Sequence, residues 1–126
     1  MESKIFFIES LETVSNAVKT MIEKGVWSLV VTRSGMPVGI VTERDIIRRC
    51  YAKGLSPDAT KLDAVMSCPI ITIEPEAPLG EAMALMAEKN IRRLYVVDKG
   101  KIIGRITQTD AFHRMLSIMV ALSAVV

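Results

Sequence analysis

The strongest constraint on this chain is an internal repeat with an offset of 65 residues. Residues 13–49 align with residues 78–114 without a gap. Identical pairs include Ala17/Ala82, Met21/Met86, Leu29/Leu94, Val31/Val96, Gly35/Gly100, Gly39/Gly104, Thr42/Thr107, Asp45/Asp110 and Arg49/Arg114. An ungapped match of this length is hard to obtain by chance, so the chain is a tandem duplication of one structural unit.

Both copies predict the same order of elements, β-α-β-β-α. In the first copy, Val14, Ala17, Val18, Met21 and Ile22 have the spacing of one helical face. Gly and Asn follow the two helices at positions that favour a left-handed C-terminal cap. Turn glycines between β-branched runs predict a hairpin in each copy. Strands are expected at 5–8, 29–32 and 38–41 and again at 70–73, 94–97 and 102–106, with further helices beginning near Thr42 and Thr107.

The fold class that follows is α+β (mixed α/β). Half of the 126 residues are hydrophobic and only 5% are aromatic, so the core must consist of aliphatic side chains and methionine. One copy alone buries little apolar area, and we expect two repeats packed sheet to sheet as a pseudo-two-fold pair. Gly54 and Pro57 are expected to end the helix of the first copy, and Pro69 is expected to end the turn before the next strand. The expected division is repeat 1 at 1–53, a linker at 54–68, and repeat 2 with a C-terminal helix at 69–126.

Composition disfavours several functions. A net charge of +2, with scattered charges, gives no strong attraction to nucleic acid. Binding through Arg44, Arg48, Arg49 and Lys53 is a weak alternative because the aromatic residues that stack on single strands are scarce. No nucleophile–base or paired-carboxylate set stands out, so no enzyme and no catalytic cofactor are expected.

Cysteines, metal ligands and targeting signals are equally uninformative. Cys50, Cys68 and His113 make no zinc set, so no metal is expected, and the thiols are expected to be buried or half-buried in a reducing compartment. No signal peptide opens the chain. The apolar tract at 115–126 is 12 residues long, too short for a membrane span of ~20 residues. We expect a cytoplasmic protein.

Two short motifs carry the functional argument, "GIVTERD" at 39–45 and "GRITQTD" at 104–110. Together with "IRRLYVVD" and the β-α-β-β-α order, they make the chain resemble the CBS domain family over about 5–113, as a stand-alone tandem pair or Bateman module. The resemblance implies a regulatory module that binds AMP, ADP, ATP or S-adenosylmethionine in the cleft between the repeats. It also implies ligand roles for the positions of Thr42/Asp45 and Thr107/Asp110.

Thr-x-x-Asp at a strand-to-helix junction is also a capping box. The two interpretations are compatible, because a helix N-terminus is a ready anion site and a carboxylate is a natural acceptor for ribose hydroxyls. A structural homodimerisation module with degenerate pockets remains the alternative function.

The two candidate sites are not equal. Strand alternation puts Arg105 on the same face as Thr107, where it either clamps phosphates or spoils the adenine pocket; the matching residue in the first copy is Ile40. Arg93 matches a family position that often holds a basic residue against phosphate. The remaining candidates are Arg44 and Thr109 for phosphate, and Ile70 and Ile71 for the adenine slot.

The last helix, expected from Asp110 to the end, is apolar nearly all round after His113. Such a helix must be buried, which favours a homodimer through helices that include 110–126. Further residues that cover this helix in a longer protein are the alternative. The expected partners are thus a second copy, a small adenosyl ligand and an unknown effector protein.

Overall fold

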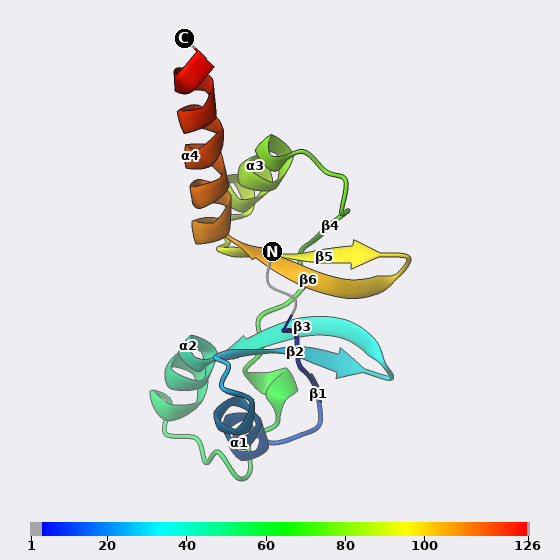
Figure 1. Cartoon of the computed structure of the whole chain (residues 1–126). Helices are drawn as coiled ribbons and strands as arrows, with labels where there is room; N and C mark the ends of the chain where they lie inside the picture. The colour runs from blue at the N-terminus through cyan, green and yellow to red at the C-terminus, as the bar shows by residue number, and fades with distance from the viewer. Residues whose placement is uncertain (1–3, 126) are drawn as a thin grey trace. The chain divides into compact units, whose positions relative to one another are not determined.

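The computed structural model describes residues 4–125 and confirms a mixed α+β fold with two β-α-β-β-α copies (Figure 1). The chain forms two compact units. Of the described residues, 5–70 make up the first unit, and Lys4 together with 71–125 belongs to the second.

The first unit is a three-stranded sheet with helices. Its elements are β1 (Phe7–Glu9), α1 (Val14–Lys24), β2 (Ser28–Arg33), β3 (Met36–Thr42), α2 (Glu43–Ile46), the π-helical turn η1 (Ile47–Tyr51) and the 3-10 turn η2 (Leu62–Ala64). The strand order is β1-β2-β3; β1 runs parallel to β2, and β2 runs antiparallel to β3.

The second unit repeats this plan. It consists of β4 (Thr72–Ile73), α3 (Leu79–Lys89), β5 (Arg93–Asp98), β6 (Lys101–Thr107) and α4 (Gln108–Val125), with strand order β4-β5-β6. The pairing is again parallel for β4 with β5 and antiparallel for β5 with β6. The alternating strand and helix patterns therefore place the elements correctly, with shifts of at most two residues at the predicted ends.

Local chemistry explains where the helices and hairpins begin and end. Thr13 caps α1 by accepting a hydrogen bond from the amide of Asn16. Gly25 and Asn90 adopt left-handed conformations at the ends of α1 and α3, as the sequence predicts. The hairpin turns at Ser34-Gly35 and Lys99-Gly100 have positive φ at both residues, the geometry that matches the twist of the flanking strands.

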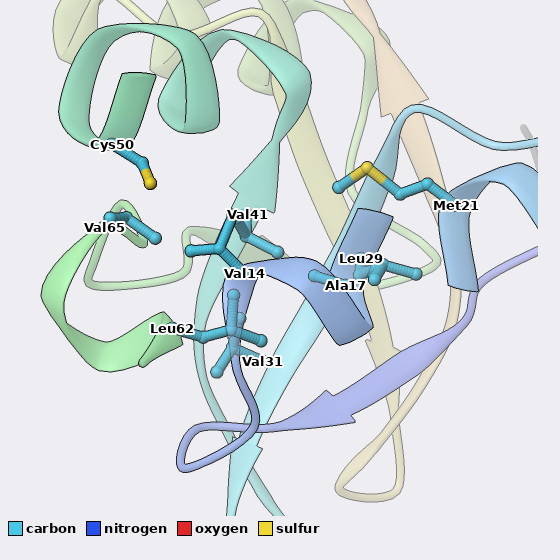
Figure 2. Packing of buried hydrophobic residues seen from close by; sticks show 9 residues of the cluster. All are labelled: Val14, Ala17, Met21, Leu29, Val31, Val41, Cys50, Leu62 and Val65. Carbon is cyan, nitrogen blue, oxygen red and sulfur yellow. The ribbon is translucent and has the colours of Figure 1, made fainter. Parts of the chain in front are cut away.

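The core of the first unit lies on one face of its sheet, beneath α1 and η1. Nine buried residues form it: Val14, Ala17, Met21, Leu29, Val31, Val41, Cys50, Leu62 and Val65 (Figure 2). Leu62 and Val65 come from the segment that the sequence analysis treats as a linker, and both are fully buried. The segment up to Ile70 thus supplies core residues to the first unit.

The second unit has a smaller core: Ile73, Ala82, Met86, Leu94, Val96 and Ala111. Helix α4 contributes Ala111 to it, whereas six larger apolar side chains between residues 112 and 122 are exposed and Met115 is half-buried. The exposed set is Phe112, Leu116, Ile118, Met119, Val120 and Leu122.

Candidate functional site

The first Thr-x-x-Asp motif lies where β3 gives way to α2, and it forms a capping box. Thr42 Oγ1 accepts a hydrogen bond of 3.2 Å from the Asp45 amide, and Asp45 Oδ2 accepts one of 2.9 Å from the Thr42 amide. The structural interpretation of this motif is therefore confirmed.

Asp45 has further partners within its own unit. Its Oδ1 accepts a hydrogen bond of 2.9 Å from the hydroxyl of Ser67 and lies 3.9 Å from Nη1 of Arg49. Only 8% of Asp45 is exposed. Both oxygens of this carboxylate are thus engaged, and a ligand would have to displace Ser67 to reach Oδ1.

The second motif lies where β6 gives way to α4 and is more open. The Thr107 amide donates to Asp110 Oδ2 over 3.1 Å, and the Asp110 amide donates to Thr107 Oγ1 over 3.1 Å. Asp110 is half-buried and lines two pockets, of about 310 and 320 Å³.

The hydrogen bond from the Thr107 backbone holds the pKa of the Asp110 carboxyl below its ordinary value. Burial acts in the opposite direction, while the Thr107 side chain and the charge of Arg105 lower the pKa further. Asp110 is therefore an anion at neutral pH, and an anion accepts hydrogen bonds from hydroxyl groups.

Strand register gathers the arginines beside this second motif. Arg93 lies directly opposite Thr107, and Tyr95 lies opposite Arg105. Directly opposite residues of an antiparallel pair share a face, and the alternating residues Leu94 and Ile106 pack on the core side. The expectation that Arg105 and Thr107 share a face is confirmed, and Arg93 joins them.

The first copy has no such cationic face. The matching pairs in its hairpin are Ser28 opposite Thr42 and Val30 opposite Ile40. The two hairpins therefore have the same backbone pairing. Only the second carries two arginine side chains, Arg93 and Arg105, near the start of a helix.

The other candidate residues from the sequence differ in how far they are buried. Thr109 is exposed in the first turn of α4, and Arg44 is exposed at the start of α2. Ile71 is half-buried and packs against the core of the second unit, while its carbonyl accepts a hydrogen bond of 3.1 Å from the Tyr95 amide. Ile70 is half-buried and belongs to the first unit.

The sequence did not single out Ser67 or Arg49 as partners of Asp45. Arg49 donates from Nη1 to the carbonyl oxygens of Val65 and Met66, over 3.1 and 2.7 Å. The identity of Arg49 and Arg114 in the repeat was a usable signal, because a cation four residues after an aspartate can reach it on a helix. Ser67 carries no such signal.

Other features of residues 4–125 add little to this site. Within that range, no cluster of three or more histidine, cysteine or acidic side chains could hold a metal ion, and no helix is long and apolar enough to cross a membrane. Cys50 is buried, as expected, but Cys68 is exposed, because it follows the last residue of the segment that packs on the first unit.

Comparison with known proteins agrees with the duplicated fold. The family model described as the CBS domain matches residues 1–52 and 62–117. An uncharacterized protein of Methanopyrus kandleri is 41% identical over 101 residues, which cover 79% of this chain and 52% of that protein. The chain therefore spans about half the length of that relative.

Shorter relatives match along most of their length. The CBS domain-containing protein YhcV of Bacillus subtilis is 30% identical over 93% of this chain and 83% of its own. A solved structure of a hexameric CBS-CP12 protein from bloom-forming cyanobacteria superposes with a TM-score of 0.77 at 32% identity, covering 89% of this chain and 66% of that one. With both repeats matched, the chain belongs to the CBS domain family as a tandem pair.

Proposed function

We propose that this chain is a regulatory module that binds an adenine nucleotide through its second repeat. Tandem CBS pairs are typically regulatory ligand-binding modules, and CBS domains generally bind adenosyl ligands. The observation that carries the assignment to the second repeat is the contrast between the two aspartates. Asp45 is held by Ser67, whereas Asp110 is half-buried and lines two pockets. Thr109 lines one of these pockets, while Arg93 and Arg105 line neither and lie on the sheet face that Thr107 shares.

The ribose is the part of the ligand that Asp110 recognises. Two adjacent hydroxyl groups donate two hydrogen bonds, and a carboxylate offers the acceptors that they need. Thr107 fixes the orientation of this carboxylate through the capping box, so little side-chain freedom is lost on binding.

The phosphates are bound by Arg93 and Arg105, with Thr109 at the start of α4 as a further donor. A helix N-terminus carries partial positive charge and favours anions. Two guanidinium groups on the same sheet face add charge-assisted hydrogen bonds. This field also favours nucleotides over S-adenosylmethionine, because the sulfonium of the latter is a cation.

The base requires an apolar contact, for which Ile71 and its neighbour Ile70 remain the candidates. In the first copy, Thr42 and Asp45 have a structural role in this proposal, and Arg44 is an exposed charge. The output of the module is the binding of an effector protein, which a ligand can alter only if it prefers one conformation of the chain.

A thermal-shift panel with AMP, ADP, ATP, GTP and S-adenosylmethionine tests the proposal. A ligand present at ~100 times its Kd adds about 2.7 kcal/mol of stability, which raises the Tm of a domain of this size by several degrees. The shift should be lost in Asp110→Ala and kept in Asp45→Ala. No shift with any adenosyl ligand would leave both motifs as capping boxes.

Self-association is a second proposed property. It is supported by the exposed apolar side chains of α4, from Phe112 to Leu122, since clustered exposed apolar surface marks an interaction site. The hexameric CBS-CP12 protein shows that a similar fold assembles with copies of itself. A homodimer that buries α4 is the simplest closed assembly.

A further inference from the structure

A pocket of about 310 Å³ lies within the second unit, and Asp110 is the one residue of its lining that the nucleotide proposal uses. Its lining is mainly apolar, with Arg114 and Asp110 at one side. The residues that line it are Ile73, Glu74, Pro75, Ala77, Leu79, Ala82, Val96, Ile103, Ile106, Asp110, Ala111 and Arg114.

In the first unit, the position that corresponds to this pocket is filled by side chains of the segment after η1. At the repeat offset, Leu79, Val96 and Ile106 correspond to Val14, Val31 and Val41. These three valines belong to the core cluster that contains Leu62 and Val65, and Figure 2 shows both side chains entering this cluster from the segment after η1.

Backbone hydrogen bonds hold that segment in place. The Leu62 amide donates to the Glu12 carbonyl over 3.0 Å, and the Asp63 amide donates to the Ser10 carbonyl over 3.2 Å. Ser67 and Ile40 exchange two backbone hydrogen bonds of 2.7 and 2.9 Å. Segment 62–67 is thus an additional edge element of the first unit.

Glycine allows this close approach. A Cβ on Gly39 would lie 2.7 Å from the Ser67 carbonyl oxygen, a distance that side-chain carbons do not tolerate. The second copy keeps glycine at the matching position, Gly104, where it is buried.

The polar contacts of the segment also have counterparts at the pocket. In the first unit, Arg49 donates to the carbonyls of Val65 and Met66, and Asp45 accepts from the Ser67 hydroxyl. Their repeat partners, Arg114 and Asp110, both line the pocket. A positive guanidinium complements carbonyl oxygens, and a carboxylate complements a hydroxyl proton, so the pocket matches such a segment in charge as well as in shape.

We propose that this pocket is the docking groove for a peptide segment with the pattern of Leu62–Ser67, supplied by a partner protein. The pattern is apolar-x-x-apolar-apolar-small polar. Its two leading apolar side chains would take the places that Leu62 and Val65 take in the first unit. Arg114 would donate to its carbonyl groups. The proposal rests on the internal comparison of the two units and does not depend on nucleotide binding.

The first test uses the intact chain and a fluorescent peptide with the sequence of residues 59–69, in which serine replaces Cys68. Fluorescence anisotropy should rise to saturation. A control peptide with aspartate in place of both Leu62 and Val65 should bind at least about tenfold more weakly, because it would bury charge in an apolar pocket. Equal binding by both peptides would overturn the proposal.

Protein variants locate the binding. Ile103→Glu changes a lining residue that is 40% exposed and so leaves the fold intact. We expect it and Arg114→Gln to weaken the peptide at least about tenfold, equivalent to ~1.4 kcal/mol. Ile47→Glu, at an exposed isoleucine of the first unit, is the matched control and should change nothing. Weakening by all three variants alike would contradict the assignment to this pocket.

A wild-type peptide that gives no rise in anisotropy with the intact chain would also overturn the proposal.

The remaining outcome concerns a different occupant. If no peptide binds and Ile103→Glu instead abolishes self-association, the groove is an interface between copies and the proposal is wrong. Nucleotide binding by Ile103→Glu is measured in parallel. The peptide assays contain no nucleotide, because a serine of the peptide that occupies Asp110 as Ser67 occupies Asp45 would compete with a ribose for this carboxylate. Loss or absence of nucleotide binding then bears on the proposed function alone.

Discussion

The hydroxyl of Ser67 donates to Asp45 Oδ1 over 2.9 Å, so the carboxylate of the first motif is bound from a position 22 residues away. The Asp110 side chain contacts Thr107 in the same way as Asp45 contacts Thr42, but it borders two pockets. Two motifs that share the Thr-x-x-Asp pattern thus differ in what their aspartates can still bind.

This difference predicts opposite effects of the two alanine variants. Asp45→Ala removes a capping acceptor and the buried acceptor for Ser67, so it should cost about 2–4 kcal/mol of unfolding free energy. Asp110→Ala loses mainly a cap, about 1 kcal/mol, but should abolish nucleotide binding. Urea unfolding and calorimetric titration with AMP measure the two effects. Equal stability losses, or AMP binding that survives in Asp110→Ala, would contradict the assignment.

Removal of Arg93 or Arg105 should weaken the binding of nucleotides but not the binding of nucleosides. Arg93→Ala and Arg105→Ala each remove a charge-assisted contact of about 1.5–3 kcal/mol, so the Kd for AMP should rise roughly tenfold or more. Adenosine lacks the phosphate, so its affinity should change little. Isothermal titration with both ligands gives the comparison.

Arg92→Ala is the control for these two variants, because Arg92 is exposed and precedes β5. An AMP affinity that improves in Arg105→Ala would mean that Arg105 obstructs the adenine pocket, the alternative that the sequence left open.

Elements and caps were predictable from the sequence because local chemistry determines them. Gly25 and Asn90 end their helices as predicted, and the shared face of Arg105 and Thr107 follows from strand alternation. The contact between Ser67 and Asp45 depends on tertiary packing, and periodicity carries no information about it. The π-helical turn η1 was not foreseen either, since its residues have ordinary helical propensity.

The packing of the segment around η2 could not be predicted from the sequence either. Gly54 and Pro57 indicate turns, but turn residues do not reveal that Leu62 and Val65 farther along are fully buried. The prediction that follows is that Leu62→Ala destabilises the first unit by about 2–5 kcal/mol, the usual range for a cavity in a packed core. Leu55→Ala, at a side chain that is 45% exposed, should cost far less. Chemical denaturation of both variants measures the two losses, and equal losses would contradict the core role of Leu62.

Acid should remove part of the stability of the second unit. The Thr107 backbone hydrogen bond lowers the pKa of Asp110 below its ordinary value of 3.8. The stabilising contribution is therefore fully present above pH 3.8, the value for the unfolded chain, and is lost as the pH falls through the lower pKa of the folded state.

Unfolding free energies measured from neutral pH downward, for the wild type and Asp110→Asn, test this behaviour. The difference between the two proteins should be constant at neutral pH and should shrink only below pH 3.8. A difference that changes around neutral pH would mean that the Asp110 carboxyl has a raised pKa, contrary to its hydrogen bonding.

The apolar surface of α4 gives the last prediction. Val120 is 66% exposed and Leu122 is 64% exposed, and burial of each such side chain contributes about 1.5–3 kcal/mol. If a homodimer buries this helix, Val120→Glu would place a charge in the interface and should convert the dimer to a monomer in sedimentation velocity. Leu11→Glu, at an equally exposed leucine of the first unit, is the matched control and should leave the dimer intact. A wild-type protein that sediments as a monomer at all concentrations would exclude self-association through α4 and leave the helix to cover a different partner.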